Sequence, residues 1–206
     1  TVAKLVMRFY DVTDGSVTID GVDVRELSQA AVRRTVGYVP QKAFLFSGTV
    51  ASNIAYADEG LPEDRLREAA RIAQAADFVE AKEEGYDAPI SQGGTNVSGG
   101  QRQRLAIARA VASNARALLF DDSFSALDSR TDARLRAELA ASLGDRTLLI
   151  VAQRVSTIMD ADQIVLEDGR MVGKGTHREL LETCDAYREI ALSQLSEEEL
   201  KGGEAA

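Results

Sequence analysis

The sequence predicts an α/β fold in which helices flank a mostly parallel β-sheet. Three short apolar runs of strand length, at 35–39, 117–120 and 147–152, alternate with segments that favour helices. The last two runs are apolar throughout, which is typical of strands buried on both faces of a parallel sheet. The 206 residues contain no internal repeat and are enough for one domain, or two small lobes, with a real core.

The first segment predicts a helix followed by a β-hairpin. Apolar residues recur with helical spacing over 2–9. Asp-Gly dipeptides at 14–15 and 20–21 are typical of tight turns and frame a hairpin over 16–24. A short helix is then expected to start at Ser28 and to lead into the first apolar strand.

The middle of the chain predicts a helical lobe over about 51–113. We expect a loop over 44–48, a helix from a Thr49 cap to Ile54, helices over about 62–74 and 77–84, a glycine-rich connection over 85–96, and a helix after Ser98.

The last part predicts a helix over about 129–143, a buried strand over 147–152 and a final hairpin over 164–172. Two short helices follow, and the only cysteine, Cys184, is interpreted as ordinary helix packing. The acidic, glycine-containing segment 196–206 is expected to be a disordered tail.

Composition excludes several classes of protein. The net charge of −9, from 33 acidic and 24 basic residues, disfavours a partner with a large phosphate backbone, so we expect no nucleic acid. One cysteine allows no internal disulfide and no multi-cysteine metal site. The sequence contains no run of about 18 apolar residues, so it predicts no transmembrane helix within these residues.

The segment 98–104 is the most informative motif. Ser98 and Gln101 have the spacing of a capping box, in which each side chain satisfies a backbone donor of the first helical turn. A plain cap does not explain Gly99 and Gly100, since each glycine costs a helix about 1 kcal/mol relative to alanine. A helix start without side chains indicates close approach by an anion, for which a phosphate is the natural candidate.

A second motif lies at the end of the run 117–120. Asp121 and Asp122 follow it directly, so their carboxylates are expected at the carboxyl edge of the sheet, where ligands of such folds bind. An apolar strand ending in an acidic residue has the form of a Walker B motif, whose Asp holds Mg²⁺ beside nucleotide phosphates. Any strand can end in Asp, so this motif depends on its neighbours.

Three other motifs accompany it, namely Gln41 after a strand, the segment 98–101 before it and the segment 125–128 after it. With all four motifs, the sequence resembles the nucleotide-binding domain of ATP-binding cassette (ABC) transporters of the exporter type, over about 1–195. The resemblance implies a P-loop NTPase-like sheet, ATPase activity, and ATP and Mg²⁺ as cofactors. It also implies the following roles: Gln41 in the Q-loop, contacting nucleotide and Mg²⁺; Ser98, Gly99, Gly100 and Gln101 in the nucleotide-binding signature; Asp121 as Mg²⁺ ligand; and Ser125 and Asp128 in the nucleotide-facing D-loop.

The resemblance is incomplete at the start of the chain. The glycine-rich Walker A loop with its Lys, the strand before it and the adenine-stacking aromatic residue are absent from these 206 residues. Thr1 corresponds to the position just after the Mg²⁺-binding Ser of that loop, so it is a nucleotide-site candidate at a truncated edge. We therefore expect an incomplete N-terminal part, impaired core folding, and no activity from this chain alone.

Two further departures concern catalysis. Asp122 stands where the family has its general base, Glu, and the carboxylate is one methylene shorter; slower hydrolysis is expected, the alternative being a tolerated exchange. Gln153 stands where the family has the switch His, and an amide carries no positive charge. The only histidine, His177, is expected to be a surface residue at a helix start.

These one-sided changes resemble the degenerate-site half of a heterodimeric exporter, in which two nucleotide-binding domains pair head to tail. The signature then serves the nucleotide of the partner domain. A transmembrane domain is expected upstream of residue 1, with this domain at the cytoplasmic face of the cell membrane. The alternatives are a slow homodimeric exporter, a soluble ABC ATPase of DNA repair or translation, and a non-functional remnant or incomplete sequence.

Overall fold

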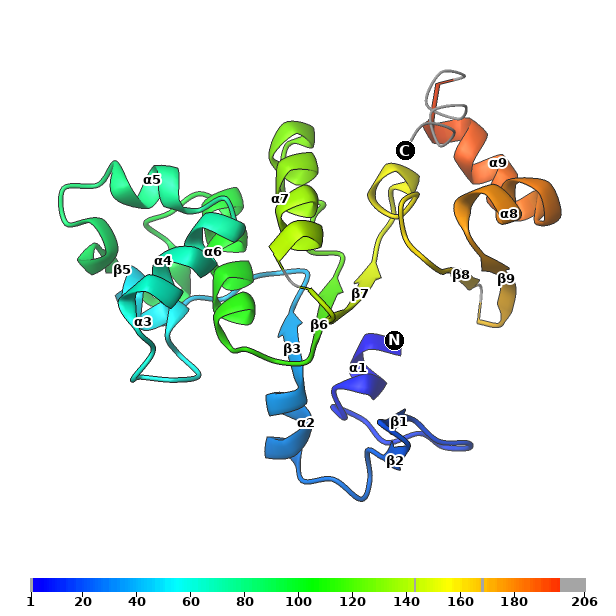
Figure 1. The fold of residues 1–206 in the computed structure, drawn as a ribbon, viewed down its shortest axis with the longest axis horizontal. Coiled ribbons are helices and arrows are strands. Elements are labelled where there is room, and N and C mark those ends of the chain that lie inside the picture. The colour runs from blue at the N-terminus through cyan, green and yellow to red at the C-terminus, as the bar shows by residue number, and fades with distance from the viewer. Residues whose placement is uncertain (1, 143, 168, 197–206) are drawn as a thin grey trace. The chain divides into compact units, whose positions relative to one another are not determined.

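The computed structural model describes residues 2–142, 144–167 and 169–196 (Figure 1). The chain divides into two compact units, Thr1–Val151 and Ala152–Ala206, and each is described by itself. Thr1 lies outside the described residues, and so does the expected disordered tail apart from Ser196.

A three-stranded parallel sheet forms the centre of the first unit. Its strands are β3 (Val36–Val39), β6 (Ala117–Asp121) and β7 (Thr147–Val151), in the order β3-β6-β7 (Figure 1). The middle strand is the most deeply buried, because Leu118, Leu119 and Phe120 expose none of their surface. The parallel sheet predicted from the three apolar runs is thus confirmed.

Strand β7 differs from the expectation of a fully buried strand. Leu149 is 41% exposed and Val151 is 40% exposed, while alternate residues of the strand are half-buried. Within the described part of the chain, β7 pairs only with β6 and is therefore an edge strand. Its apolar sequence was interpreted as evidence for burial on both faces, which does not hold for the described residues.

The first unit begins with α1 (Val2–Val6), the hairpin strands β1 (Thr18–Ile19) and β2 (Val22–Asp23), and α2 (Gln29–Thr35). Asp20 and Gly21 have φ angles of 52° and 82°, as a two-residue type I′ turn requires. Ser28 caps α2 by accepting a hydrogen bond from the Ala31 amide at 3.1 Å. The helix, hairpin and cap predicted for this segment are confirmed.

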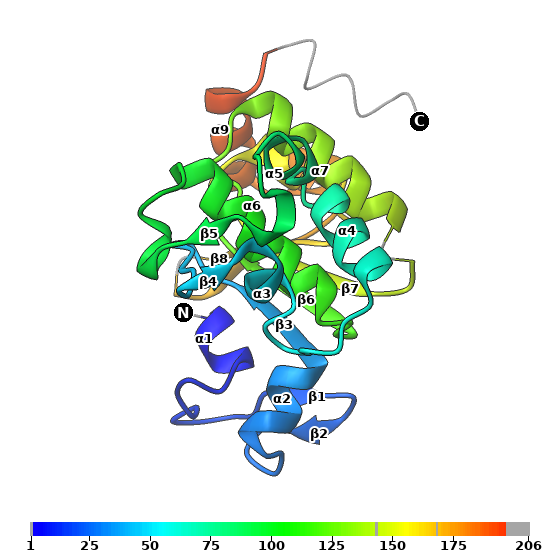
Figure 2. The same ribbon diagram turned by 90° about the vertical axis from the view of Figure 1, so that its left-hand side faces the viewer.

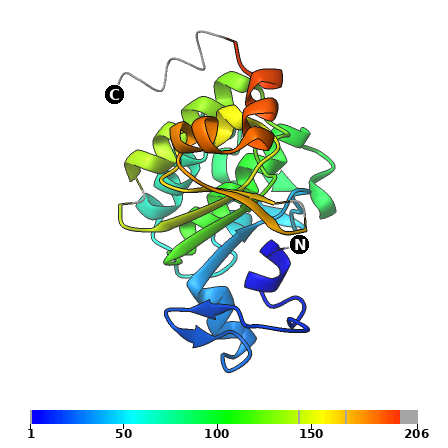
Figure 3. The same cartoon turned by 90° about the vertical axis from the view of Figure 1, so that its right-hand side faces the viewer.

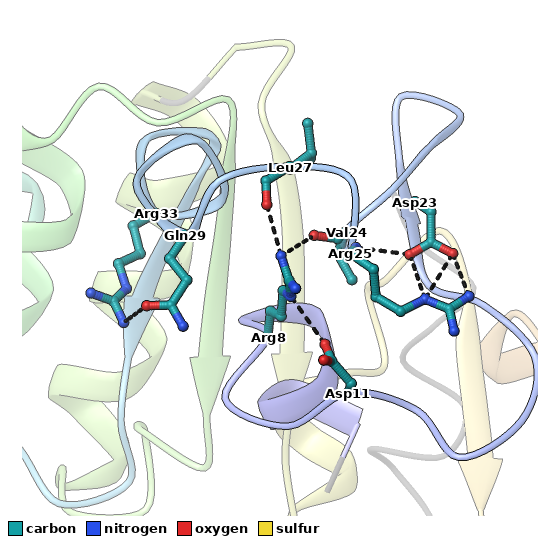
Figure 4. Close-up of polar contacts among 8 residues, drawn as sticks. All are labelled: Arg8, Asp11, Asp23, Val24, Arg25, Leu27, Gln29 and Arg33. Carbon is teal, nitrogen blue, oxygen red and sulfur yellow. Dashed lines mark hydrogen bonds and ion pairs between the residues drawn. The ribbon is translucent and has the colours of Figure 1, made fainter.

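Arg8 joins the two ends of this segment (Figure 4). Its guanidinium donates to the carbonyl oxygens of Val24 at 3.1 Å and Leu27 at 2.8 Å, and to the carboxylate of Asp11 at 3.0 Å. Its φ of 49° reverses the chain direction after α1. The stretch between α1 and α2 is therefore held by one side chain as well as by its hairpin.

Four helices occupy the region where a helical lobe was expected (Figure 2). They are α3 (Val50–Ile54), α4 (Glu63–Ile72), α5 (Ala76–Glu80) and α6 (Gly99–Ala112). Two short strands, β4 (Gly48–Thr49) and β5 (Pro89–Ile90), pair antiparallel beside them, where only a loop and a connection were expected. Two 3₁₀ turns, Gly85–Asp87 and Gln92–Gly94, complete that connection.

Helix α6 is the central helix of this region. Leu105 and Ile107 expose none of their surface, and α3 and α4 both pack against it. Helix α7 (Ser129–Ser142) follows β6 and adds Leu135 and Leu139 to the same core. The candidate motifs at the start of α6 and the end of β6 therefore stand on well-packed elements.

The second unit contains the 3₁₀ turn Val155–Thr157, a hairpin and two helices. The strands β8 (Ile164–Glu167) and β9 (Met171–Gly175) pair antiparallel, and α8 (His177–Thr183) and α9 (Asp185–Gln194) follow. In Figure 3 the orange-red helices lie beside the yellow-to-orange hairpin. Cys184 is buried in this core, close enough to Gly173 that a Cβ there lies 2.9 Å from its sulfur. The hairpin, both helices and the packing role of Cys184 are confirmed.

The expectation of a surface position for His177 is wrong. His177 begins α8, as expected, but only 6% of its surface is exposed. Its Nδ1 lies 2.7 Å from the Tyr187 hydroxyl of α9, and its Nε2 makes no hydrogen bond to any described residue. Burial lowers the pKa of His177, which favours the neutral imidazole. The helix-start pattern could not reveal that α9 covers this side chain.

Candidate functional site

The start of α6 is an exposed, fully formed capping box. The Ser98 hydroxyl accepts from the Gln101 amide at 3.2 Å, and the Gln101 side-chain oxygen accepts from the Ser98 amide at 3.0 Å. Both reciprocal hydrogen bonds predicted from the spacing are present. Ser98 and Gly99 are exposed, so the first helical N–H groups lie at the surface of the unit.

The two glycines of this turn are not required by the packing of the chain. A Cβ on Gly99 meets no atom within 4 Å, and one on Gly100 meets only ordinary contacts, with the Ala126 carbonyl at 3.7 Å and Leu127 at 3.9 Å. Neither glycine has a left-handed φ. A missing side chain that the fold does not need is consistent with approach by a group from outside the chain.

The carboxyl ends of β3 and β6 bring several candidate side chains together. The Tyr38 hydroxyl donates to Asp121 at 2.9 Å, and the Gln41 amide nitrogen donates to Asp122 at 2.7 Å. Burial, followed by the hydrogen bond to Asp121, raises the pKa of Tyr38 to about 12. The phenol therefore stays protonated at neutral pH and remains a donor to the carboxylate.

Asp122 is held in an unusual backbone conformation. Its φ is 51°, a left-handed value that is uncommon for non-glycine residues and that Asp adopts more readily than most of them. Its amide donates to the Val151 carbonyl of β7 at 2.9 Å, and its carbonyl accepts from the Ser125 hydroxyl at 2.8 Å. Only 9% of Asp122 is exposed.

The segment after Asp122 ends in a helix cap. Asp128 accepts from the Thr131 amide at 3.0 Å and from the Thr131 hydroxyl at 2.7 Å, at the start of α7. These hydrogen bonds, the backbone one first, lower the pKa of Asp128. Ser125 and Asp128 are both exposed, so this segment presents polar groups at the surface near the start of α6.

Two candidates are not part of the described first unit. Gln153 belongs to the second unit, where its backbone carbonyl accepts from the Gln194 side chain at 3.1 Å and its residue surface is exposed. Thr1 lies outside the described residues. The first unit thus gathers Gln41, Asp121 and Asp122 at one sheet edge.

Three further polar residues at this edge were not identified from the sequence. Tyr38 contacts Asp121, the buried Ser123 donates to the Val39 carbonyl at 2.8 Å, and Gln103 donates to the Pro40 carbonyl at 3.2 Å. The parallel register pairs Tyr38 with Leu119, so Tyr38 and Asp121 share a face of the sheet. That signal was available only once the two strands were paired.

The donors at this edge suit a magnesium ion that arrives with a nucleotide. The described residues include no group of three or more His, Cys, Asp and Glu side chains that could hold a metal by themselves. Mg²⁺ is usually held by one or two carboxylates together with substrate phosphates. Asp121 and the side-chain oxygen of Gln41 are donors of this kind, so the residues present fit the ion.

A cavity of about 600 Å³ lies elsewhere in the first unit, at the amino-terminal ends of the sheet strands. Val36, Ala117 and Thr147 are among its lining residues, and none of the candidate site residues is. Ligands of parallel α/β sheets bind at the opposite, carboxyl ends. We therefore place the candidate site at Gln41, Asp121 and Asp122 and not in this cavity.

Comparison with known proteins gives matches over nearly the whole chain. Residues 1–125 match the family model described as ABC transporter. An ABC transporter ATP-binding protein of Mycobacterium tuberculosis is 48% identical over 198 residues, which are 94% of this chain and 34% of that protein. An ATP-dependent lipid A-core flippase of Yersinia pestis is 44% identical over 199 residues, covering 96% of this chain and 34% of the flippase.

A solved structure agrees with these relatives. The structure of a bacterial Atm1-family ABC exporter with ATP bound matches with a TM-score of 0.90 and 39% identity, covering 95% of this chain and 35% of that one. The chain spans about a third of the length of the curated relatives it matches. Among the residues described here, no helix is long and apolar enough to cross a membrane.

Proposed function

The chain belongs to the ABC transporter family, and we propose that it binds ATP and powers export as one of two paired nucleotide-binding domains. The match to an ATP-bound exporter and the parallel sheet with its carboxylates at the carboxyl edge support this proposal. ATP is the substrate, and Mg²⁺ is the expected cofactor. Asp121 and Gln41 hold Mg²⁺, which neutralises phosphate charge when bound.

The observation that carries the proposal is the contrast between two motifs. The Ser98 turn, which is the first turn of α6 with the capping box Ser98–Gln101, is complete and exposed at Ser98 and Gly99. A Cβ on Gly99 meets no other atom within 4 Å. The base position instead carries Asp122, which is short, largely buried and hydrogen-bonded to Gln41. Gln153 replaces an ionisable switch residue with a neutral amide.

We infer from this contrast that the chain is the degenerate-site half of a heterodimeric exporter. Its own site hydrolyses ATP slowly, because a base must lie within hydrogen-bond reach of the attacking water and Asp122 is retracted. Ser98 and the backbone amides of the exposed Gly99 and the half-buried Gly100 stabilise charge that develops on a phosphate held by the partner domain. We propose that these 206 residues by themselves are inactive, because the Walker A loop that grips the phosphates is not among them.

A transmembrane domain is the second proposed partner. Phe44 and Tyr56 are 46% and 57% exposed, and the Tyr56 ring stacks on Phe46 at 4.4 Å, close after Gln41 in the chain. Exposed aromatic groups of this kind are typical of protein contact surfaces. We propose that they face the membrane domain, which places the chain at the cytoplasmic face of the cell membrane.

Two other assignments compete with this one. A slow homodimeric exporter has the same altered residues at both sites. A soluble ABC ATPase acting on nucleic acid is disfavoured by the net charge of −9. The match to an exporter over 95% of the chain also favours transport.

The experiment is to purify the full-length transporter subunit by itself and together with its candidate partner, and to measure ATP hydrolysis in both. We expect low turnover from the subunit alone and high turnover from the pair. High turnover by the lone subunit contradicts the heterodimer proposal, and it favours the homodimeric alternative.

A further inference from the structure

Gln103 is a buried polar side chain that neither the signature nor the sheet edge accounts for. It lies on α6, two residues after the capping-box residue Gln101, and only 2% of its surface is exposed. Its amide nitrogen donates to the carbonyl oxygen of Pro40 at 3.2 Å. Most buried polar side chains are hydrogen-bonded, and the Pro40 carbonyl is the partner of this amide nitrogen.

The carbonyl that Gln103 binds is the one directly before Gln41. The preceding carbonyl, that of Val39, accepts from the buried Ser123 hydroxyl at 2.8 Å. Two consecutive carbonyls at the end of β3 are therefore fixed by side chains from α6 and from the segment after Asp122. Gln41 begins immediately after this double anchor and donates to Asp122 at 2.7 Å.

We propose that Gln103 is a positioning residue for Gln41. It ties the backbone at Pro40 to α6, and so sets where the Gln41 amide lies relative to Asp122. Gln103 belongs to α6, the helix that Ser98 caps. Its hydrogen bond to the Pro40 carbonyl therefore connects the signature helix with the residue directly before Gln41. This inference rests on the proposed function, in which Gln41 serves the chain's own nucleotide and Ser98 serves that of the partner.

The first test is hydrogen exchange on the full-length transporter assembled with its partner. Gln103→Met keeps the side-chain length without a donor, and Gln103→Glu keeps the shape with oxygen in place of the NH₂ group. Both variants are expected to speed amide exchange in the peptide that covers 38–46, by roughly three- to tenfold for one lost hydrogen bond. Ser113→Ala is the control at the C-cap of α6, because among the described residues the Ser113 hydroxyl donates to the Ala110 carbonyl of the same helix.

The second test is a double-mutant cycle on the KM for Mg-ATP at the chain's own site, measured with the partner's site inactivated. If Gln103 acts through Gln41, Gln103→Met raises KM in the wild-type background and changes nothing further in the Gln41→Ala background. The positioning role is overturned if the Gln103 variants leave amide exchange over 38–46 unchanged. It is also overturned if the effects of Gln103→Met and Gln41→Ala on KM simply multiply in the double variant. Faster exchange combined with a silent Gln41→Ala variant instead overturns the role of Gln41, and with it the proposed function.

Discussion

Gly99→Ala separates the folding role of the α6 start from its proposed binding role. The added methyl group meets no atom of the chain within 4 Å, and Gly99 has no left-handed φ that an alanine has to strain. Alanine is favoured over glycine in helices by up to about 1 kcal/mol. The substitution is therefore expected to leave the fold as stable as before, or slightly more stable.

The same substitution is expected to lower the rate of ATP hydrolysis, although it does not destabilise the fold. A phosphate that binds the first helical amides has to approach the backbone at the place the methyl group fills. Loss of one transition-state donor of this kind typically costs about 2.7–4 kcal/mol, or about 100- to 1000-fold in kcat. Partial displacement of the phosphate gives a smaller loss, so we expect at least a tenfold fall in turnover of the assembled transporter.

The assay compares the melting temperature and the ATPase rate of the assembled transporter carrying Gly99→Ala, Gly60→Ala or neither. Gly60 lies in an exposed loop, where a methyl group contacts only Asp58 at 3.4 Å, and its variant is expected to match the wild type in both measurements. A Gly99→Ala transporter with unchanged melting temperature and unchanged turnover refutes the idea that a phosphate approaches this turn.

Three other predictions concern the remaining altered or buried residues. Asp122→Glu extends the carboxylate by one methylene and is expected to raise ATPase turnover of the chain's own site by roughly tenfold, measured with the partner's site inactivated. Gln153→Ala is expected to change the turnover of the assembled transporter by less than about twofold, since a neutral amide is replaced. Burial lowers the pKa of His177 from 6.5, so the unfolded state takes up a proton before the folded state as the pH falls. The melting temperature of the wild type should therefore fall more steeply with decreasing pH than that of His177→Gln below about pH 6.5. Above that pH the two proteins should show the same dependence. If the two melting temperatures change in parallel at all pH values, the linkage to His177 is excluded.

The local structure of the chain was largely predictable because short-range chemistry decides it. Ser28, Thr49 and Ser98 cap helices as their spacing indicates, each by accepting a hydrogen bond from an amide three residues later. The Asp20-Gly21 dipeptide forms the turn that its φ preferences predict. Apolar runs also predicted the positions of the three parallel strands, although the burial inferred from them holds for β6 and not for the edge strand β7.

Long-range contacts were not predictable in the same way. Gln103 reaches Pro40 across 63 positions of sequence, and Tyr38 reaches Asp121 across 83. Neither residue belongs to a spacing pattern within its own element, so only the packing of α6 and the register of β3 on β6 reveal them. His177 was misjudged for the same reason, because α9 buries it from a distance of ten residues.

The candidate site was predicted at the level of positions and not of contacts. The sequence placed Asp121 and Asp122 at the edge of the sheet and Gln41 after another strand, and the structure pairs the two strands and brings Gln41 to Asp122. It also shows that Gln41 binds Asp122 and that Asp122 has a left-handed backbone, neither of which a motif specifies. Roles for these residues remain proposals that the variants above test.

In the proposed heterodimer, most ATP is hydrolysed at the site that holds the partner's nucleotide and that Ser98 of this chain completes. Little is hydrolysed at the site of Asp122. The most direct measurement is the ATPase rate of the full-length heterodimer with Ser98→Arg or Asp122→Asn introduced only in this chain. We predict that Ser98→Arg nearly abolishes turnover, because it blocks the phosphate at the α6 start, and that Asp122→Asn leaves most of it. The reverse result, a silent Ser98→Arg and an inactive Asp122→Asn, contradicts the account.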